Sequence, residues 1–181
     1  YTFWESGLPL YSDSNTIDAE EKVHYPLSQI EHPEGILLIS GGLGRTLKEV
    51  FKHGPAHVDY VELDPALTRA ADDAGIIEKS PSLSIIHTDA RRYIKKTTQT
   101  YDAILIDLPD PDTFQLNRFF TDEFFTLAKR ILTKGGVFCV HLDYSPNYLS
   151  DIRRKKLSSL YNTAQRRFQH VLILPGEQAY F

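Results

Sequence analysis

Apolar and polar positions alternate in a regular order from Gly35 to the end of the chain. Short apolar runs, typical of buried strands, are separated by longer amphipathic stretches that are typical of helices. This order predicts consecutive β-α-β units, which build a doubly wound parallel sheet. The predicted strands cover residues 36–40, 58–62, 83–87, 102–107, 136–141 and 170–174, and the predicted helices cover residues 45–52, 65–74, 90–96, 121–132 and 150–168.

The last residues of the chain refine this fold class. Residues 177–181 predict a seventh strand, which forms a hairpin with residues 170–174 through the turn Pro175-Gly176. An antiparallel hairpin at this end marks the Rossmann-like sheet of the class I S-adenosylmethionine-dependent methyltransferase type. We therefore predict an α/β domain with a sheet of that type over residues 35–181.

The first 34 residues follow a different pattern. Apolar segments at residues 1–4 and 8–11 flank Glu5-Ser6-Gly7, a three-residue turn in which Gly7 suits a positive φ. This arrangement predicts a small β-hairpin, followed by a lead-in helix over residues 20–31. We therefore treat residues 1–34 as a separate N-terminal element.

Composition and charge narrow the class of protein. The chain has 181 residues, of which 41% are hydrophobic and 24% charged, which predicts one soluble globular domain with a small appendage. The net charge of −4 argues against nucleic acid as a partner. The single cysteine, Cys139, lies in an apolar run and predicts a core thiol in a reducing compartment, which favours the cytoplasm. The histidines are scattered, and we predict no metal site.

The candidate site lies where the first two strands end, because ligands of a doubly wound sheet bind outside the carboxyl ends of its strands. The first strand runs into a glycine-rich loop with Gly41, Gly42 and Gly44, which leads into a helix N-terminus. The second strand ends in Glu62, twenty residues after Gly42, a spacing at which a carboxylate reaches a ribose diol. The pair predicts a nucleoside site, with a tight turn and a surface charge as the structural alternatives.

The third and fourth strands also end in carboxylates. Asp89 can accept a hydrogen bond from an adenine amine, or cap the helix that begins at Ala90. Asp107 and Asp110 belong to a segment that two prolines stiffen. One carboxylate there can anchor an ammonium group while another takes the proton of an attacking amine. An Asp- and Pro-rich turn is the alternative, and Tyr144, after the fifth strand, is a candidate wall of the substrate cleft.

Together these motifs resemble the spermidine synthase family of polyamine aminopropyltransferases. The similarity spans residues 20–141 and includes Val61-Glu62-Leu63-Asp64 and Thr88-Asp89-Ala90. The segment Asp107-Leu108-Pro109-Asp110-Pro111 is similar to the subset found as soluble domains of membrane-embedded bacterial proteins. Because the chain starts at Tyr1 and has no methionine, we expect a fragment, and the cytosolic domain of a membrane protein is an alternative to a free cytoplasmic protein.

The resemblance implies a reaction and a role for each candidate residue. In that family an amine such as putrescine displaces methylthioadenosine from decarboxylated S-adenosylmethionine and gains an aminopropyl group. By resemblance, Glu62 binds the ribose and Asp89 the adenine of this co-substrate. Asp107 takes the proton of the attacking amine, and Asp110 helps to hold the polyamine. Because relatives often dimerise, a homodimer is a further expectation.

Several positions depart from the family pattern. Leu43 stands where an aspartate usually holds the aminopropyl ammonium group, and Arg45 stands where glycine is usual. Glu20 and Glu21 replace a Tyr-Gln pair, and Leu10 replaces a glutamine. Because Arg45 can pair with the carboxylate of intact S-adenosylmethionine, a methyltransferase that uses this donor is one alternative. A catalytically silent domain that binds a nucleoside or a polyamine is the other.

Overall fold

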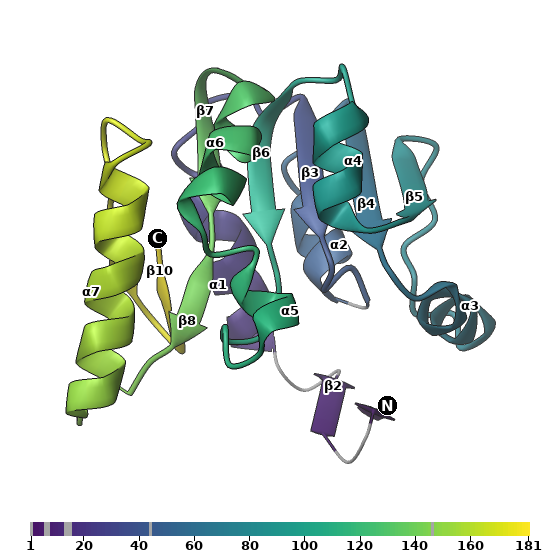
Figure 1. Cartoon of the computed structure of the whole chain (residues 1–181). Coiled ribbons are helices and arrows are strands. Elements are labelled where there is room, and N and C mark those ends of the chain that lie inside the picture. Colours follow the sequence, from purple (N-terminus) through teal and green to yellow (C-terminus); the bar gives the residue numbers. More distant parts are fainter. Residues whose placement is uncertain (1, 6–7, 13–15, 44, 146) are drawn as a thin grey trace.

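The centre of the molecule is a five-stranded parallel sheet with the strand order β5-β4-β3-β6-β7 (Figure 1). The computed structural model describes residues 2–5, 8–12, 16–43, 45–145 and 147–181. The chain order reverses between β3 and β6, and such a reversal is where ligands bind in doubly wound sheets. The strands are β3 (Gly35–Ile39), β4 (His57–Glu62), β5 (Leu83–His87), β6 (Tyr101–Ile106) and β7 (Leu132–Cys139).

Two layers of helices cover the sheet, as the doubly wound prediction requires (Figure 1). One layer, α1 and α2, packs with Ile36 and Leu38 of β3, whereas α4, α6 and α7 pack with Leu37 and Ile39 on the opposite face. The successive apolar residues of β3 are buried because helices cover both faces of this strand. The helices are α1 (Thr16–Leu27), α2 (Arg45–Phe51), α3 (Pro65–Asp73), α4 (Ala90–Lys96), α5 (Phe114–Asn117), α6 (Asp122–Arg130) and α7 (Asp151–Gln165). None of these helices combines the length and the apolar character needed to cross a bilayer.

The C-terminal strands form a second, antiparallel sheet with the order β8-β10-β9. Its strands are β8 (His141–Asp143), β9 (Leu174–Pro175) and β10 (Gln178–Tyr180). The predicted terminal hairpin is confirmed, but the strand predicted over residues 170–174 is wrong, because only Leu174 and Pro175 pair with β10. The short strand β10 leaves residues 170–173 without a pairing partner in the described sheet, and the side chains of Leu172 and Ile173 are largely exposed.

Other predicted boundaries also shift. The lead-in helix spans Thr16–Leu27 rather than residues 20–31, and it contains Pro26 in its last turn. The helix predicted over residues 121–132 ends at Arg130, and the predicted fifth strand is divided into β7 and β8. The N-terminal hairpin is confirmed as β1 (Thr2–Glu5) and β2 (Leu8–Ser12), which pair antiparallel. Its predicted turn residues Ser6 and Gly7 lie outside the described residues.

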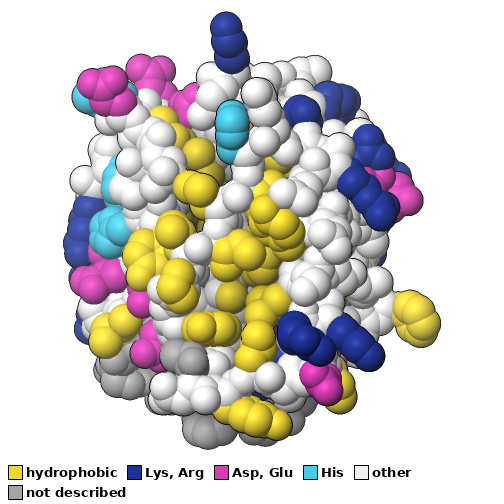
Figure 2. Space-filling model, turned by 90° about the vertical axis from the view of Figure 1, so that its left-hand side faces the viewer, with side chains coloured by type: hydrophobic (Ala, Val, Ile, Leu, Met, Phe, Trp, Pro, Cys, Tyr) yellow, Lys and Arg dark blue, Asp and Glu magenta, His cyan; other side chains and the backbone are white. Residues whose placement is uncertain are grey.

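The side of the molecule near α7 carries an apolar groove (Figure 2). Its volume is about 710 Å³, and it is lined by β7, the end of α1 and the segment that follows α7. Cys139 lies in its wall, and burial raises the pKa of this thiol to about 12, as suits a core residue. The described lining contains no Asp or Glu side chain, whereas Glu62, Asp107 and Asp110 line another cavity.

Candidate functional site

A cavity of about 580 Å³ opens at the carboxyl ends of the parallel strands. Its walls come from the glycine-rich loop after β3, the end of β4, the Asp-Pro segment after β6, and α1. The start of α2, Leu67 of α3, Leu116 of α5, both ends of β8 and Gln178 of β10 complete the lining. Four of the predicted site residues line this cavity together, namely Gly41, Glu62, Asp107 and Asp110.

The glycine-rich loop packs directly on the carboxylate after β6. Gly41 has a φ of +65°, and a Cβ at this position would overlap the Oδ2 atom of Asp107. A Cβ at Gly42 would lie 2.6 Å from the ring of Tyr60. Ser40 has a φ of 59°, a strained conformation for a residue with a side chain. Both predicted glycines are therefore required by close packing, whereas Gly44 lies outside the described residues.

Glu62 ends β4 with its carboxylate held in a fixed orientation. Its Oε1 accepts hydrogen bonds from the backbone N–H groups of Leu63 at 2.7 Å and Asp64 at 3.2 Å. Its Oε2 accepts from the hydroxyl of Tyr60 at 2.9 Å and from that of Ser40 at 3.4 Å. Burial raises the pKa of the Tyr60 hydroxyl, and the neighbouring carboxylate raises it further, so this hydroxyl stays a donor. The site thus has a buried, preorganised acceptor where the sequence predicts ribose binding.

Asp107 lies between two basic side chains, Lys22 and His141, that were not predicted as its partners. Its Oδ1 accepts from the Nζ of Lys22 at 2.9 Å and from the Nε2 of His141 at 3.2 Å. Lys22 also pairs with Asp18 at 2.8 Å on the same helix. Burial would raise the pKa of Asp107, but the Lys22 ammonium and His141 outweigh this effect and hold the pKa far below its ordinary value. In this state Asp107 is ionised, which is the form in which a carboxylate can accept a hydrogen bond or a proton.

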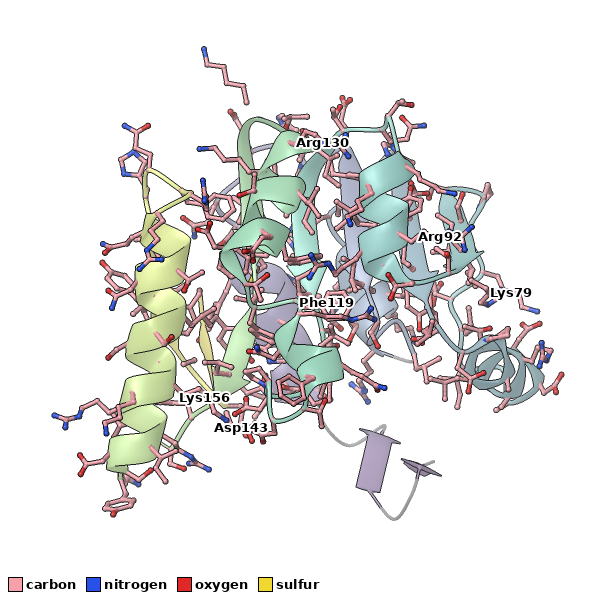
Figure 3. All side chains as sticks on the ribbon, in the orientation of Figure 1. Lys79, Arg92, Phe119, Arg130, Asp143 and Lys156 are labelled. Atoms are coloured by element: carbon pink, nitrogen blue, oxygen red, sulfur yellow. The ribbon has the colours of Figure 1, made fainter. Side chains whose placement is uncertain are left out.

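Asp110 and Asp112 also line this cavity, and their carboxylates share one cationic partner. Asp110 accepts from the backbone N–H of Asp143 at 2.8 Å, which fixes the Asp-Pro segment against β8. The Nζ of Lys156 lies 2.7 Å from Asp110 and 2.8 Å from Asp112. Figure 3 shows Lys156 on α7 beside Asp143. An ammonium group of the chain therefore already bridges both carboxylates.

Three predicted site residues in the described part of the chain do not line the cavity, namely Asp89, Tyr144 and Gly42, which packs on Tyr60. Asp89 caps α4 by accepting from the backbone N–H of Arg92 at 3.0 Å, and it pairs with Arg118 at 2.5 Å. It nevertheless lies one strand from Glu62, because β5 and β4 are neighbours and Thr88 donates to the Glu62 carbonyl. Tyr144 is half-buried beyond β8 and is not part of the lining.

The positions that depart from the family pattern have separate places in the fold. Leu43 is buried with Ala71 and Ile77, so it is a core residue at the edge of the cavity. Arg45 lines the cavity at the start of α2, next to the glycine-rich loop. Glu21 accepts from the backbone N–H of Glu177 at 2.7 Å and joins α1 to the C-terminal hairpin. Glu20 is half-buried on α1, and Leu10 lies on β2.

Three basic partners of the site carboxylates were not predicted from the sequence, namely His141, Lys22 and Lys156. His141 starts β8, directly beyond the strand next to β6, so the strand-end rule that indicates Asp107 also points to His141. Lys22 and Lys156 lie on helices rather than at strand ends, so the strand-end rule does not indicate them. Their pairing with the Asp-Pro segment depends on how α1 and α7 dock on the sheet. In the described part of the chain, no group of three or more His, Cys, Asp or Glu side chains is arranged to hold a metal ion.

Known proteins are similar to this chain in both sequence and fold. The family model described as Spermine/spermidine synthase domain matches residues 16–175. A polyamine aminopropyltransferase of Korarchaeum cryptofilum is 35% identical over 127 residues, which are 67% of this chain and 39% of that relative. A spermidine synthase crystallised with the transition state analogue AdoDATO superposes with a TM-score of 0.82 at 25% identity, over 99% of this chain and 64% of that one.

A methyltransferase shares the fold at lower similarity. Human methyltransferase-like protein 13 in complex with SAH superposes with a TM-score of 0.64 at 22% identity, over 91% of this chain and 78% of that one. This likeness concerns the fold alone and confirms the predicted Rossmann-like class. The chain spans less than half of the aminopropyltransferase of Korarchaeum cryptofilum and about two thirds of the spermidine synthase.

Proposed function

The chain belongs to the spermine/spermidine synthase family, and on that premise we propose that it transfers an aminopropyl group from decarboxylated S-adenosylmethionine to a polyamine such as putrescine. The observation that carries this proposal is the convergence of Gly41, Glu62, Asp107 and Asp110 on one acidic cavity. The aminopropyltransferase and spermidine synthase relatives support the same reaction.

The glycine-rich loop and Glu62 form the donor half of the proposed site. The Glu62 carboxylate would accept hydrogen bonds from the two ribose hydroxyls, as a carboxylate at the end of the second strand does in nucleoside sites of this fold type. Because its oxygens already accept four hydrogen bonds, the two ribose hydroxyls would replace two of them, and the longest is that from Ser40 at 3.4 Å. For Asp89 we propose a contact with the adenine amine beside its bonds to Arg92 and Arg118.

Asp107 and Asp110 form the acceptor half. The amine nitrogen attacks the aminopropyl carbon bonded to sulfur, the C–S bond breaks, and its electron pair stays on sulfur to give methylthioadenosine. A free amine is mostly protonated at neutral pH and must lose a proton before or during attack. We assign this proton to Asp107, whose Oδ2 lies against the glycine-rich loop while Oδ1 is bound by Lys22 and His141.

Product mass tests this proposal directly. The purified chain is incubated with putrescine and either decarboxylated or intact S-adenosylmethionine, and the amine products are weighed by mass spectrometry. We expect an added aminopropyl unit with the decarboxylated donor. An added methyl unit with the intact donor would assign a methyltransferase instead, and no product with either donor would favour a binding domain.

Homodimer formation, a membrane segment outside these residues and a cytoplasmic location stay predictions from the sequence. Each is separable from the reaction. Size-exclusion chromatography with light scattering of the purified chain measures its oligomeric state without reference to activity.

A further inference from the structure

Both carboxylates proposed for the acceptor already bind an ammonium group that belongs to the chain. Lys22 from α1 lies on Asp107, and Lys156 from α7 lies between Asp110 and Asp112. A bound diamine would bring two ammonium or amine groups to this same cavity. Lys22 and Lys156 therefore occupy the carboxylates that would bind the nitrogen atoms of such an acceptor.

The two lysines differ in how readily they can be displaced. The side chains of Lys22 and Asp107 are only 15% and 14% exposed, and Lys22 has a second buried partner in Asp18. Separating a buried ion pair leaves both charges without partners and is strongly unfavourable. The side chain of Lys156 is 27% exposed, nearly twice as much as that of Lys22. Its partner Asp110 is only 12% exposed, but its second partner Asp112 is 71% exposed, so solvent can replace the bond to Asp112 at small cost.

The side chain of Lys156 is protonated in this arrangement. Burial would lower its pKa, but the hydrogen bonds and charges of Asp110 and Asp112 outweigh burial and raise it. Asp110 also accepts a hydrogen bond from the backbone N–H of Asp143, a contact that does not involve Lys156. The two carboxylates thus form a preorganised ammonium subsite that Lys156 fills.

We propose that Lys156 is a specificity-determining residue that holds the place of the acceptor's distal ammonium group between Asp110 and Asp112. An acceptor with a second cationic group must displace Lys156 in order to bind, whereas Lys22 stays on Asp107. A monoamine brings only its reacting nitrogen and leaves Lys156 in place. Lys156 therefore weakens the binding of diamines and has little effect on monoamines. This inference rests on the proposed function for the identity of the acceptor site.

Calorimetric titration of Lys156→Met tests the inference without using activity. Putrescine and butylamine, a diamine and a monoamine with the same carbon chain, are titrated into the full chain in the presence of methylthioadenosine. We expect Lys156→Met to bind putrescine about tenfold more tightly than the unsubstituted chain, with little change for butylamine, because one weak, partly exposed ion-pair network no longer competes. Lys79→Met is the matched control, since it removes an equally charged residue whose pair with Asp72 lies on the far side of the molecule (Figure 3).

The outcomes separate this inference from the proposed function. Equal or weaker putrescine binding by Lys156→Met, or an equal gain for both amines, would overturn the role of Lys156 even if the chain transfers aminopropyl groups. Absence of amine binding by every variant would overturn the inference together with the acceptor site. If Lys156→Met does not fold, as judged by thermal melting, Lys156→Gln removes the same charge while keeping a donor, and the same selective gain is expected.

Discussion

Replacing Gly41 by alanine should disrupt the contact on which the acidic cavity depends. Gly41 has a φ of +65°, a conformation that costs an alanine about 1–2 kcal/mol, partly offset by the lower entropy of the unfolded chain. In addition, the new methyl group would overlap the carboxylate of Asp107 and force it from Lys22 and His141. Loss of such charge-assisted hydrogen bonds costs about 1.5–3 kcal/mol. We therefore expect Gly41→Ala to lose about 3 kcal/mol of unfolding free energy.

Two other glycines provide a matched control for the backbone part of this cost. Gly54 and Gly75 have φ values of +65° and +66°, and a Cβ at either position would meet no described atom within 4 Å. Alanine at these positions should therefore cost only about 1 kcal/mol. Urea denaturation of the three variants measures the difference, and titration with methylthioadenosine should show weaker binding for Gly41→Ala alone. Equal stability losses and equal affinities in all three variants would refute the direct packing of the loop on Asp107.

Other perturbations test the remaining parts of the site. Asp107→Asn should reduce turnover by about 10² to 10⁴, the range for a positioned base, with little change in nucleoside affinity, and unchanged turnover in a steady-state assay would remove Asp107 from the reaction. Glu62→Gln should weaken methylthioadenosine binding by about tenfold, because a carboxylate accepts two hydroxyl donors better than an amide does; an unaltered dissociation constant by calorimetry would argue against ribose contact. In the folded chain the pKa of Asp107 is lower than in the unfolded chain, where it is about 3.9. Ionised Asp107 therefore adds its full contribution to the free energy of unfolding above about pH 3.9, and this contribution is lost as the pH falls below that value. Urea denaturation at about pH 6 and about pH 3.5 should therefore show a smaller acid-dependent loss in Asp107→Asn, and equal losses would exclude this contribution.

The order of the parallel strands and of the helices between them was predictable because burial on both faces of the sheet leaves a strong local signal, whereas the four-residue helix α5 was not predicted. Successive apolar residues such as Leu37 and Leu38 are buried on opposite faces of β3, and this pattern is visible without any neighbour. The strand predicted over residues 170–174 failed for the opposite reason. Leu172 and Ile173 are apolar but largely exposed, and whether they pair depends on the length of β10 rather than on their own sequence.

The residues of the site likewise fall into those that a local sequence pattern predicts and those that depend on how helices dock. Strand ends indicate Glu62 and Asp107 because parallel strands bring their carboxyl ends to one edge. The same rule could have indicated His141, which begins directly beyond the neighbouring strand. Lys156 lies 46 residues from Asp110 in the sequence, and its pairing is set by the docking of α7, which no local pattern encodes. The sequence therefore predicts the carboxylates of this cavity but not the cations that bind them.

The central claim is that one acidic cavity holds an adenosyl donor beside an amine acceptor. A crystal structure of the chain with methylthioadenosine tests it most directly. The ribose hydroxyls are expected within hydrogen-bond distance of the Glu62 carboxylate, with the sulfur on the side of the cavity that Asp107 lines. Methylthioadenosine bound elsewhere, for example in the apolar groove beside β7, or with its ribose remote from Glu62, would contradict the claim.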